Sequence, residues 1–531
     1  MTQTNTSNKG TLGILSLTSI IVGTVIGSGI YVKNNFLMET TSSAILVFVG
    51  WIIGGLLVLA ILISFFEINS ITTENKSAGT LSNYALFLFS PRASRIIAIY
   101  YFLFYFPFLI SSKSIFAASQ IYSLNVLDIG LYFNWLILTL TALIPTILIA
   151  SLLIFTLRGT KFAITTGAII KTMPLFFIII MMFLVLFGLS FGDVTQLNHI
   201  FDANNSINSG LSDENAVLNL FLILPAIMFT FDGFLYSHSL SDEAKSQSTL
   251  KLASIIAIFI VTFVYLLFSL SIVLLSPNGK YGVLDVIGSM FPRADWLLDI
   301  TVFVIIISII SSAIGSTMAN NYSATSASMN NQISDPNGIL VRRGKSTLPY
   351  NTMIIFLAPL LFWFVIMRTF DLIAISILTD VSPFYIGMTD YMTNILATMN
   401  FFIYGILIFG AILNRKSKKQ DVDKEKLFYP ASFFAIILIS IITFTNIYDI
   451  FYKIIFSNDP YEALLHLTFI ILFFSLGIII IWLNEIWHKT NSYKVSERKQ
   501  ILINSFENHI PYSDIDYDYE KEVMKNNRKN L

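Results

Sequence analysis

Three glycines interrupt the first apolar segment of the chain. Residues 21–32 read Ile-Val-Gly-Thr-Val-Ile-Gly-Ser-Gly-Ile-Tyr-Val. A glycine inside a helix costs about 1 kcal/mol relative to alanine, and a helix in lipid cannot leave its backbone groups unpaired. A break at membrane depth is tolerated where it lines a cavity, and the freed N–H and C=O groups can then hold a small polar solute. The Gly27-Ser28-Gly29 segment therefore predicts a solute site built from backbone.

A second interruption lies at 227–236, Ile-Met-Phe-Thr-Phe-Asp-Gly-Phe-Leu-Tyr. The first interruption lies in span one and the second in span six. The offset between them is an odd number of spans, so equivalent elements of the two halves would cross the membrane in opposite directions. Broken helices at matched positions of two inverted halves are typical of secondary-transporter sites. Half-helix N-termini suit a carboxylate, and carbonyls at the opposed break suit an ammonium group, so an amino acid zwitterion satisfies both. Close helix packing remains the alternative for either glycine motif alone.

Lys171 is predicted to lie deep in the fifth span. It follows Arg158 and Lys161 by about ten residues, which corresponds to about 15 Å of helix in a hydrocarbon core about 30 Å thick. Because desolvation disfavours a charged amine, a lysine at this depth is suited to take up and release a proton during transport. Two other interpretations remain: a fixed cation in place of a coupling sodium, or a structural lysine held by carbonyls of the broken first helix.

Other deep polar residues carry weaker signals. Lys113 and Arg368 are expected to reach toward the membrane interface, and Glu67 is expected to form structural hydrogen bonds. Asp232 has two interpretations, a contact to a cationic substrate or a cap on N–H groups that the break exposes. Three serines of the eighth span are expected to face inward or to bond their own backbone: Ser311, Ser312 and Ser316.

The composition is that of a polytopic α-helical membrane protein. Of 531 residues, 55% are hydrophobic and only 12% are charged, whereas soluble proteins have about 25% charged residues. The mean hydropathy is +0.74. Apolar runs of membrane-spanning length are predicted near 12–36, 44–68, 96–122, 132–156, 163–190, 216–239, 251–276, 296–320, 349–367, 391–414, 428–449 and 463–487. Boundaries in 369–393 are loose, because a weak apolar run there precedes Asp380 and Pro383 and permits a re-entrant or interfacial piece.

Charge and cysteine content exclude several functions. The formal net charge is zero, so no global field indicates nucleic acid as a partner. The chain has no cysteine, which excludes disulfides and thiol chemistry. With only five histidines a buried metal site has little to build from, and no cofactor or metal is expected. The partners are a small amino acid or amine, a proton and the lipid bilayer, and the oligomeric state stays open.

Lysine and arginine predict the orientation. They gather in alternate connections, while the opposite loops contain only Lys33, Lys280, Arg293, Arg368 and Lys453. We expect the protein to lie in the plasma membrane. The positive-inside rule then places both of its termini in the cytoplasm. The basic connections contain Lys76, Arg92, Arg95, Arg158, Lys161, Lys245, Lys251, Arg342, Arg343, Lys345, Arg415, Lys416, Lys418 and Lys419.

The predicted organisation follows from these spans. A cytoplasmic N-terminus is followed by a first repeat of spans one to five, an extracellular loop, a second repeat of spans six to ten, two more spans and a tail. The tail is expected to be largely disordered, since it mixes charges of both signs. In the same order the boundaries are 1–11, 12–190, 191–215, 216–415, 416–489 and 490–531.

In three sequence motifs the chain resembles the amino acid–polyamine–organocation (APC) superfamily of permeases. The motifs are the glycine-rich 23–31, the aromatic–glycine run 229–234 followed by Asp242-Glu243-Ala-Lys245, and the passage from Arg158 to Lys171-Thr-Met-Pro. The resemblance covers roughly 12–415 and implies the five-plus-five inverted repeat of the leucine transporter, with two helices after it. The chain departs from the family in its second span and at the end of its eighth, so the resemblance indicates the class more strongly than the substrate.

The resemblance also implies roles for individual residues. The backbone of Ile26, Gly27, Ser28, Gly29 and Ile30 would receive the substrate carboxylate. The backbone of Phe229, Thr230 and Phe231, beside Asp232, would receive the amino group, and the Phe229 ring would be a gate. Lys171 matches the fifth-span lysine that occupies a sodium-site position in proton-coupled members.

The function that these features predict is secondary active transport of amino acids, by proton-coupled symport. The alternative is an exchanger for cationic amino acids or polyamines. A channel would be expected to show rings of repeated polar residues, and a membrane enzyme would need catalytic groups that converge near a span end. Glu67 and Asp380 are candidates for the latter, but nothing converges on them, so no enzymatic activity is expected.

Overall fold

The computed structural model describes most of the apolar part of the chain, and almost all of it is helical. Outside helices and turns the described residues contain one isolated β-bridge, between Phe191 and Val194. This confirms the all-α membrane architecture. The predicted cytoplasmic N-terminus, the tail, Ser28, Asp380 and the Asp242-Glu243 pair lie outside the described residues, which are 13–27, 29–74, 79–122, 131–155, 166–167, 169–194, 206–235, 244–276, 281–341, 350–378, 384–457 and 460–490.

Nine helical rods among the described residues are long and apolar enough to cross a membrane. Eight are α4 (Ala44–Glu74), α8 (Leu131–Phe155), α13 (Gln247–Leu275), α15 (Asp295–Met329), α16 (Tyr350–Ile377), α17 (Gly387–Ser417), α18 (Phe428–Phe456) and α19 (Tyr461–Thr490). The ninth joins α6 (Pro91–Ile99), the π-helix η1 (Tyr100–Tyr105) and α7 (Phe106–Ile121). Shorter apolar helices are α1 (Ile14–Val25), α10 (Met173–Leu186), α11 (Ala216–Leu222) and α12 (Leu224–Thr230).

The remaining helices are short connections. They are α2 (Gly29–Val32), α3 (Asn34–Thr41), α5 (Leu81–Leu88), η2 (Ser206–Ser212), α14 (Val283–Met290) and η4 (Ile339–Val341). Serine side chains cap the N-terminal ends of helices, as at α13, where Ser246 Oγ accepts from the Thr249 amide at 3.1 Å. Such N-caps satisfy one of the amides that a helix start leaves unpaired.

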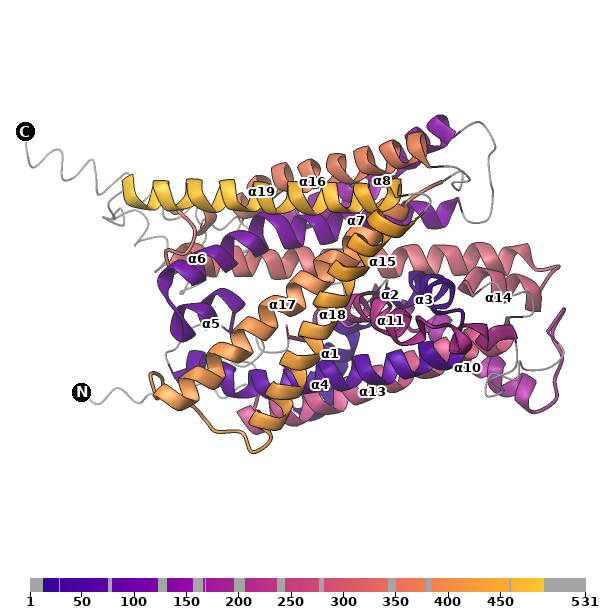
Figure 1. Ribbon diagram of the computed structural model, residues 1–531, viewed down its shortest axis with the longest axis horizontal. Coiled ribbons are helices and arrows are strands. Elements are labelled where there is room, and N and C mark those ends of the chain that lie inside the picture. Colours follow the sequence, from indigo (N-terminus) through magenta and orange to yellow (C-terminus); the bar gives the residue numbers. More distant parts are fainter. Residues whose placement is uncertain are drawn as a thin grey trace, which may run out of the picture.

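The α15 helix runs along the long axis of the molecule (Figure 1). The α15 helix packs against α7, while α1 packs against α13 and α13 against α4. The oblique pair α17 and α18 pack on each other, and α17 also packs against α12. Elements from distant parts of the chain therefore surround the two predicted breaks.

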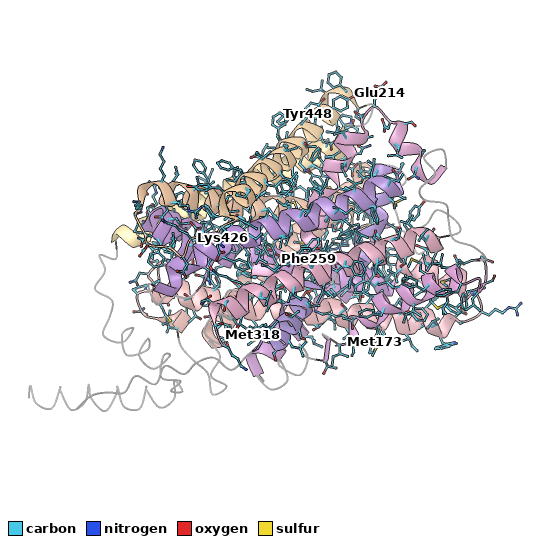
Figure 2. The ribbon with its side chains drawn as sticks, turned by 90° about the horizontal axis from the view of Figure 1, so that it is seen from below. Met173, Glu214, Phe259, Met318, Lys426 and Tyr448 are labelled. Carbon is cyan, nitrogen blue, oxygen red and sulfur yellow. The ribbon has the colours of Figure 1, made fainter. Side chains whose placement is uncertain are left out.

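The outer surface of the bundle is apolar. Phe259 is 59% exposed and Phe444 is 71% exposed, and Figure 2 shows side chains such as Phe259 and Tyr448 along the helices. A soluble protein seldom exposes a continuous apolar surface of this kind. The surface is suited to lipid contact.

The third predicted span contains the π-helix for an identifiable reason. Pro107 has no amide hydrogen, so it cannot bond the carbonyl four residues earlier, at Leu103. Trp363 of α16 provides the missing donor, and its Nε1 lies 2.8 Å from Leu103 O. A donor from another helix thus pairs the freed carbonyl, as a break inside lipid requires.

Two predicted span boundaries need correction. The span predicted at 349–367 continues as α16 to Ile377, because Arg368 and Asp371 are buried in a polar cluster and do not end the helix. In the fifth span, α10 begins only at Met173, and Lys171 and Thr172 form a turn. The depth expected for Lys171 rested on a continuous helix from Arg158, and 156–165 lie outside the described residues.

Candidate functional site

The first helix is broken where its glycines predict. The α1 helix ends at Val25, and Ile26 is extended, with ψ of 107°. Its amide still donates to Val22 O at 3.0 Å, and a new helix begins at Gly29. The predicted segment Ile26–Ile30 therefore contains the break, with Ser28 outside the described residues.

The second helix is broken at the aromatic–glycine motif. The α12 helix ends at Thr230, and 231–233 form turns. The Asp232 amide lies 3.3 Å from Phe229 O, and Gly233 has φ of +95°. That left-handed conformation is open to glycine at little cost and to most other residues only with strain, so Gly233 is required by the turn.

The two breaks touch each other. A Cβ atom placed on Gly29 would lie 2.8 Å from Thr230 Cγ2, 3.0 Å from Thr230 Cα and 3.2 Å from a ring atom of Phe229. Such contacts are too short for a real side chain, so Gly29 is needed for the close approach of the two backbones. The structure thus brings together the two halves of the site predicted from sequence.

Tyr265 of α13 links the breaks, and no sequence pattern predicted this role. Its hydroxyl lies 3.1 Å from Val25 O and 3.1 Å from Thr230 O, the last helical residues before each break. A phenol has one proton, so it donates to one of these carbonyls at a time. Its ring packs against Phe231 and Trp51, with centroids 5.3 Å and 5.4 Å away.

Lys171 contacts both sides of the first break. Its Nζ donates to Gly23 O in α1, and its own carbonyl accepts from the Tyr31 hydroxyl in α2. A Cβ atom on Gly167, one turn earlier, would overlap Ser311 of α15. Lys171 is therefore held against the broken first helix, as the structural interpretation of this lysine expects, and its protonation behaviour remains a prediction.

Lys113 does not reach toward the interface, which corrects that expectation. It is 6% exposed, and its Nζ lies 3.0 Å from Ser312 Oγ and 2.9 Å from Ser316 Oγ of α15. Ser312 Oγ also lies 3.2 Å from the position of a Cβ on Gly27. The four consecutive serine or lysine positions 111–114, within an apolar span, are a sequence signal that could have indicated an inward-facing surface.

Asp232 is tied to the third span. Its Oδ1 accepts from the Tyr105 hydroxyl, and the Gly233 amide lies within hydrogen-bonding range of the same carboxylate. Asn400 of α17 donates to Tyr105 Oη at 3.1 Å and to Tyr404 Oη at 2.8 Å. Asp232 thus pairs with a freed amide, as the capping interpretation expects.

Lys33 is buried and not in an open loop, which corrects its place among the loop cations. Its Nζ lies 2.5 Å from Asp390 Oδ1, 3.0 Å from Thr393 Oγ1 and 2.8 Å from Asn394 Oδ1. These four residues are called the Lys33 clamp below. The clamp joins the segment after α2 to the first turns of α17, and Lys33 Nζ lies 5.2 Å from the ring centroid of the predicted gate Phe229.

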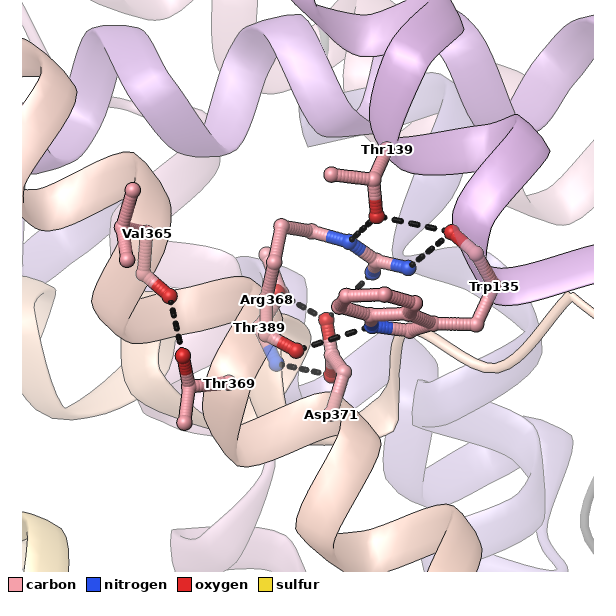
Figure 3. Close-up of polar contacts among 7 residues, drawn as sticks. All are labelled: Trp135, Thr139, Val365, Arg368, Thr369, Asp371 and Thr389. Atoms are coloured by element: carbon pink, nitrogen blue, oxygen red, sulfur yellow. Dashed lines mark hydrogen bonds and ion pairs between the residues drawn. The ribbon is translucent and has the colours of Figure 1, made fainter. Parts of the chain in front are cut away.

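Arg368 is also buried, contrary to the expectation that it reaches the interface. Its Nη1 lies 2.6 Å from Asp371 Oδ2, and its Nε lies 2.9 Å from Thr139 Oγ1 (Figure 3). Asp371 in turn accepts from the amide and hydroxyl of Thr389, at 3.1 Å and 2.7 Å. Arg368, Asp371, Thr389, Thr139 and Trp135 are called the Arg368 cluster, and it fixes the start of α17 next to Asp390.

Glu67 forms the structural bonds expected of it. Its Oε2 accepts from the Glu425 amide at 3.0 Å, and Arg415 Nε lies 3.4 Å from its Oε1. Of the residues described, no group of three or more histidine, aspartate or glutamate side chains is placed to hold a metal ion.

Comparison with known proteins identifies the family of this chain. The serine/threonine exchanger SteT of Bacillus subtilis (strain 168) is 26% identical over 275 residues, which are 51% of this chain and 56% of that protein. An uncharacterized protein of Mycoplasma pneumoniae is 23% identical over 319 residues, 53% of this chain and 54% of that protein. The chain thus spans about half the length of the curated relatives it matches. The family model described as "Amino acid permease" matches residues 12–453, so the chain belongs to the amino acid permease family.

Proposed function

We propose that this protein moves amino acids across the plasma membrane by alternating access. Family membership makes it a transporter and not an enzyme. The observation that carries the proposal is the contact between the two helix breaks at Gly29 and Thr230. Because the ends of two broken helices then share one locus, a single small zwitterion can contact backbone groups of both.

The proposed binding mode uses backbone for the groups that all amino acids share. Amides of Ile26–Ile30 hold the carboxylate, and carbonyls at the end of α12 hold the ammonium group. Tyr265, which lies within 3.1 Å of carbonyls on both breaks, keeps them in register. The Phe229 ring, directly beneath Lys33, closes one end of the site as a gate.

Energy coupling is proposed to run through Lys171. Its ammonium bonds the Gly23 carbonyl in α1, so loss of the proton weakens one tie between the fifth span and the first. This supports proton-coupled symport. Exchange is the second candidate, and the name of the serine/threonine exchanger among the relatives favours it. The alternative substrates of such an exchanger are polyamines and cationic amino acids, which would contact the Asp232 carboxylate.

Uptake by purified protein in liposomes tests the function. Labelled serine, threonine, arginine and putrescine are offered with and without an inward proton gradient, and with and without internal substrate. Symport predicts uptake that follows the gradient in empty liposomes. Uptake that ignores the gradient but requires internal substrate establishes exchange, and no uptake of any amino acid or amine refutes the proposed function.

The contact between the breaks is tested by Gly29→Ala. The added methyl group collides with Thr230, so serine uptake is expected to fall at least about 10-fold, in line with the 1–3 kcal/mol of an overpacked position. Gly315→Ala is the matched control, because nothing lies within 4 Å of a Cβ there and glycine-to-alanine changes in helices are tolerated or stabilising. Equal uptake by the two variants would contradict the proposed site, and partial recovery in Gly29→Ala/Thr230→Ser would support it.

A further inference from the structure

Lys113 brings a buried positive charge, without an ion-pair partner among the described residues, to the two breaks. Among the described residues, its hydrogen-bond partners are the neutral hydroxyls of Ser312 and Ser316. An ammonium group has three donors and no acceptor, so one N–H remains for a further partner. A buried cation is costly unless it is paired, and the residues described here offer Lys113 no carboxylate within ion-pair distance.

The position of this charge is defined by the first break. Lys113 Nζ lies 3.0 Å from Ser312 Oγ, which in turn packs against Gly27. One hydroxyl therefore separates the ammonium from the backbone that is proposed to hold the substrate carboxylate. Lys113 also lies within electrostatic range of Asp232 at the second break and of Lys171.

The balance of charge around the breaks is positive while Lys171 holds its proton. The two lysines, Lys113 and Lys171, face one carboxylate, Asp232, which already accepts from Tyr105. Lys33 does not change this balance, because Asp390 neutralises it. A zwitterion adds no net charge and offers its carboxylate to Lys113, whereas a ligand with only ammonium groups increases the imbalance.

We propose that Lys113, positioned by Ser312 and Ser316, is a carboxylate-selecting residue that limits the substrates to molecules with an α-carboxylate. Amino acids without net positive charge are accepted, and polyamines and amino acid amides are rejected. This inference rests on the proposed transport function and names the substrate class of the same site. It decides against the polyamine alternative, which the carboxylate of Asp232 alone leaves open.

The test pairs a change in the protein with a change in the ligand. Wild type and Lys113→Gln are compared in liposomes for uptake of labelled serine and for its inhibition by unlabelled serine, serinamide, arginine and putrescine. Serinamide has the shape of serine but a neutral amide in place of the carboxylate. Wild type is expected to prefer serine to serinamide by about 30-fold or more, the value of a buried charge pair.

In Lys113→Gln the apparent affinity for serine is expected to fall by about the same factor, while that for serinamide changes less than about 3-fold. Lys113→Arg, which keeps the charge, is expected to recover most of the preference. A general structural role would instead lower both affinities equally. Equal losses for serine and serinamide in Lys113→Gln, or a wild type that accepts putrescine as well as serine, would overturn the inference but leave transport established.

Ser312→Ala provides the second variant in case Lys113→Gln fails to fold. It keeps the lysine and removes the hydroxyl between the ammonium and Gly27, so serine affinity is expected to fall about 5-fold, as for one lost hydrogen bond, with serinamide unaffected. An unchanged preference in Ser312→Ala contradicts the positioning role. A wild type that moves none of these ligands refutes the transport function itself, and the carboxylate selection with it.

Discussion

Two regions of the molecule bury positive charge in opposite ways. In the Lys33 clamp and the Arg368 cluster each cation has a carboxylate partner within 2.6 Å. Beside the helix breaks, the acceptors that the described part of the chain offers Lys113 and Lys171 are hydroxyls and a backbone carbonyl. All four cations are at most 6% exposed, so burial alone does not distinguish the regions.

The difference indicates which charges hold the fold together and which await a partner. A paired buried charge becomes strongly destabilising when its partner is removed. An unpaired one lowers stability already and is retained where function needs it. The Arg368 cluster and the Lys33 clamp adjoin each other, because Thr389 of the cluster and Asp390 of the clamp are neighbours in the chain. Together they hold the start of α17 against α16 and against the residues after α2. The region of Lys113 and Lys171, by contrast, is the part of the molecule that we propose a substrate carboxylate and a proton complete.

Asp371→Asn is expected to have the largest effect on stability. It leaves the Arg368 guanidinium buried without a counter-charge, which costs about 3–5 kcal/mol, and it weakens the bonds to Thr389. Thermal unfolding in detergent measures the loss. The matched control is Lys453→Gln, which breaks the ion pair with Asp449 at the surface, where Lys453 is 55% exposed, and such pairs contribute about 0.5 kcal/mol or less.

A double variant sharpens the same prediction. Arg368→Met/Asp371→Leu removes both charges, and replacing a buried pair by apolar groups is often neutral. It is therefore expected to be more stable than Asp371→Asn. A double variant as unstable as the single one would mean that the hydrogen bonds to Thr389 and Thr139, and not the ion pair, stabilise this region.

Asp390→Asn is expected to have an intermediate effect. Lys33 keeps its bonds to Thr393 and Asn394, so the loss is about 2 kcal/mol, the value of one charged hydrogen bond. Because the clamp lies over Phe229, this end of the site should open more often. The chain has no cysteine, so a single Phe36→Cys provides a unique thiol. The Phe36 ring that it replaces has its centroid 6.0 Å from Lys33 Nζ.

Maleimide labelling of Phe36→Cys measures that opening. Faster labelling in Asp390→Asn than in the otherwise identical protein with Asp390 is the expected result. Equal labelling rates, with both proteins folded, would show that the clamp is structural and does not close the site.

The two helix breaks could be predicted from sequence because a glycine or an acidic residue in an apolar span has few explanations. The lysines show the limit of that reasoning. Lys33, Lys113 and Arg368 each lie near the end of an apolar run, where a long side chain ordinarily reaches water. Whether it does so depends on the neighbouring helices, and Asp390, Ser312 and Asp371 come from positions that the sequence alone does not bring together.

Tyr265 shows a second limit. A tyrosine in an apolar span is ordinary by composition, and its role depends on two carbonyls, 240 and 35 residues away in the chain. Backbone acceptors leave no trace in side-chain identity. The contact of Gly29 with Thr230 is likewise a property of packing, although the glycine itself indicated that a close approach was needed.

Lys171→Met is expected to have the smallest effect on stability, with the opposite sign to Asp371→Asn. Methionine fills a similar volume without a charge to desolvate, and the Gly23 carbonyl that loses its donor lies next to the break. Thermal unfolding should therefore change by less than about 1 kcal/mol, toward greater stability. Proton-gradient-dependent uptake should be lost in the same protein. If Lys171→Met instead unfolds as easily as Asp371→Asn, its bond to Gly23 is part of what holds the fold together, and the contrast between the two regions fails at this residue. If it remains stable and still responds to the gradient, the proton is carried elsewhere, and Asp232, bonded to Tyr105 at the second break, becomes the group to test.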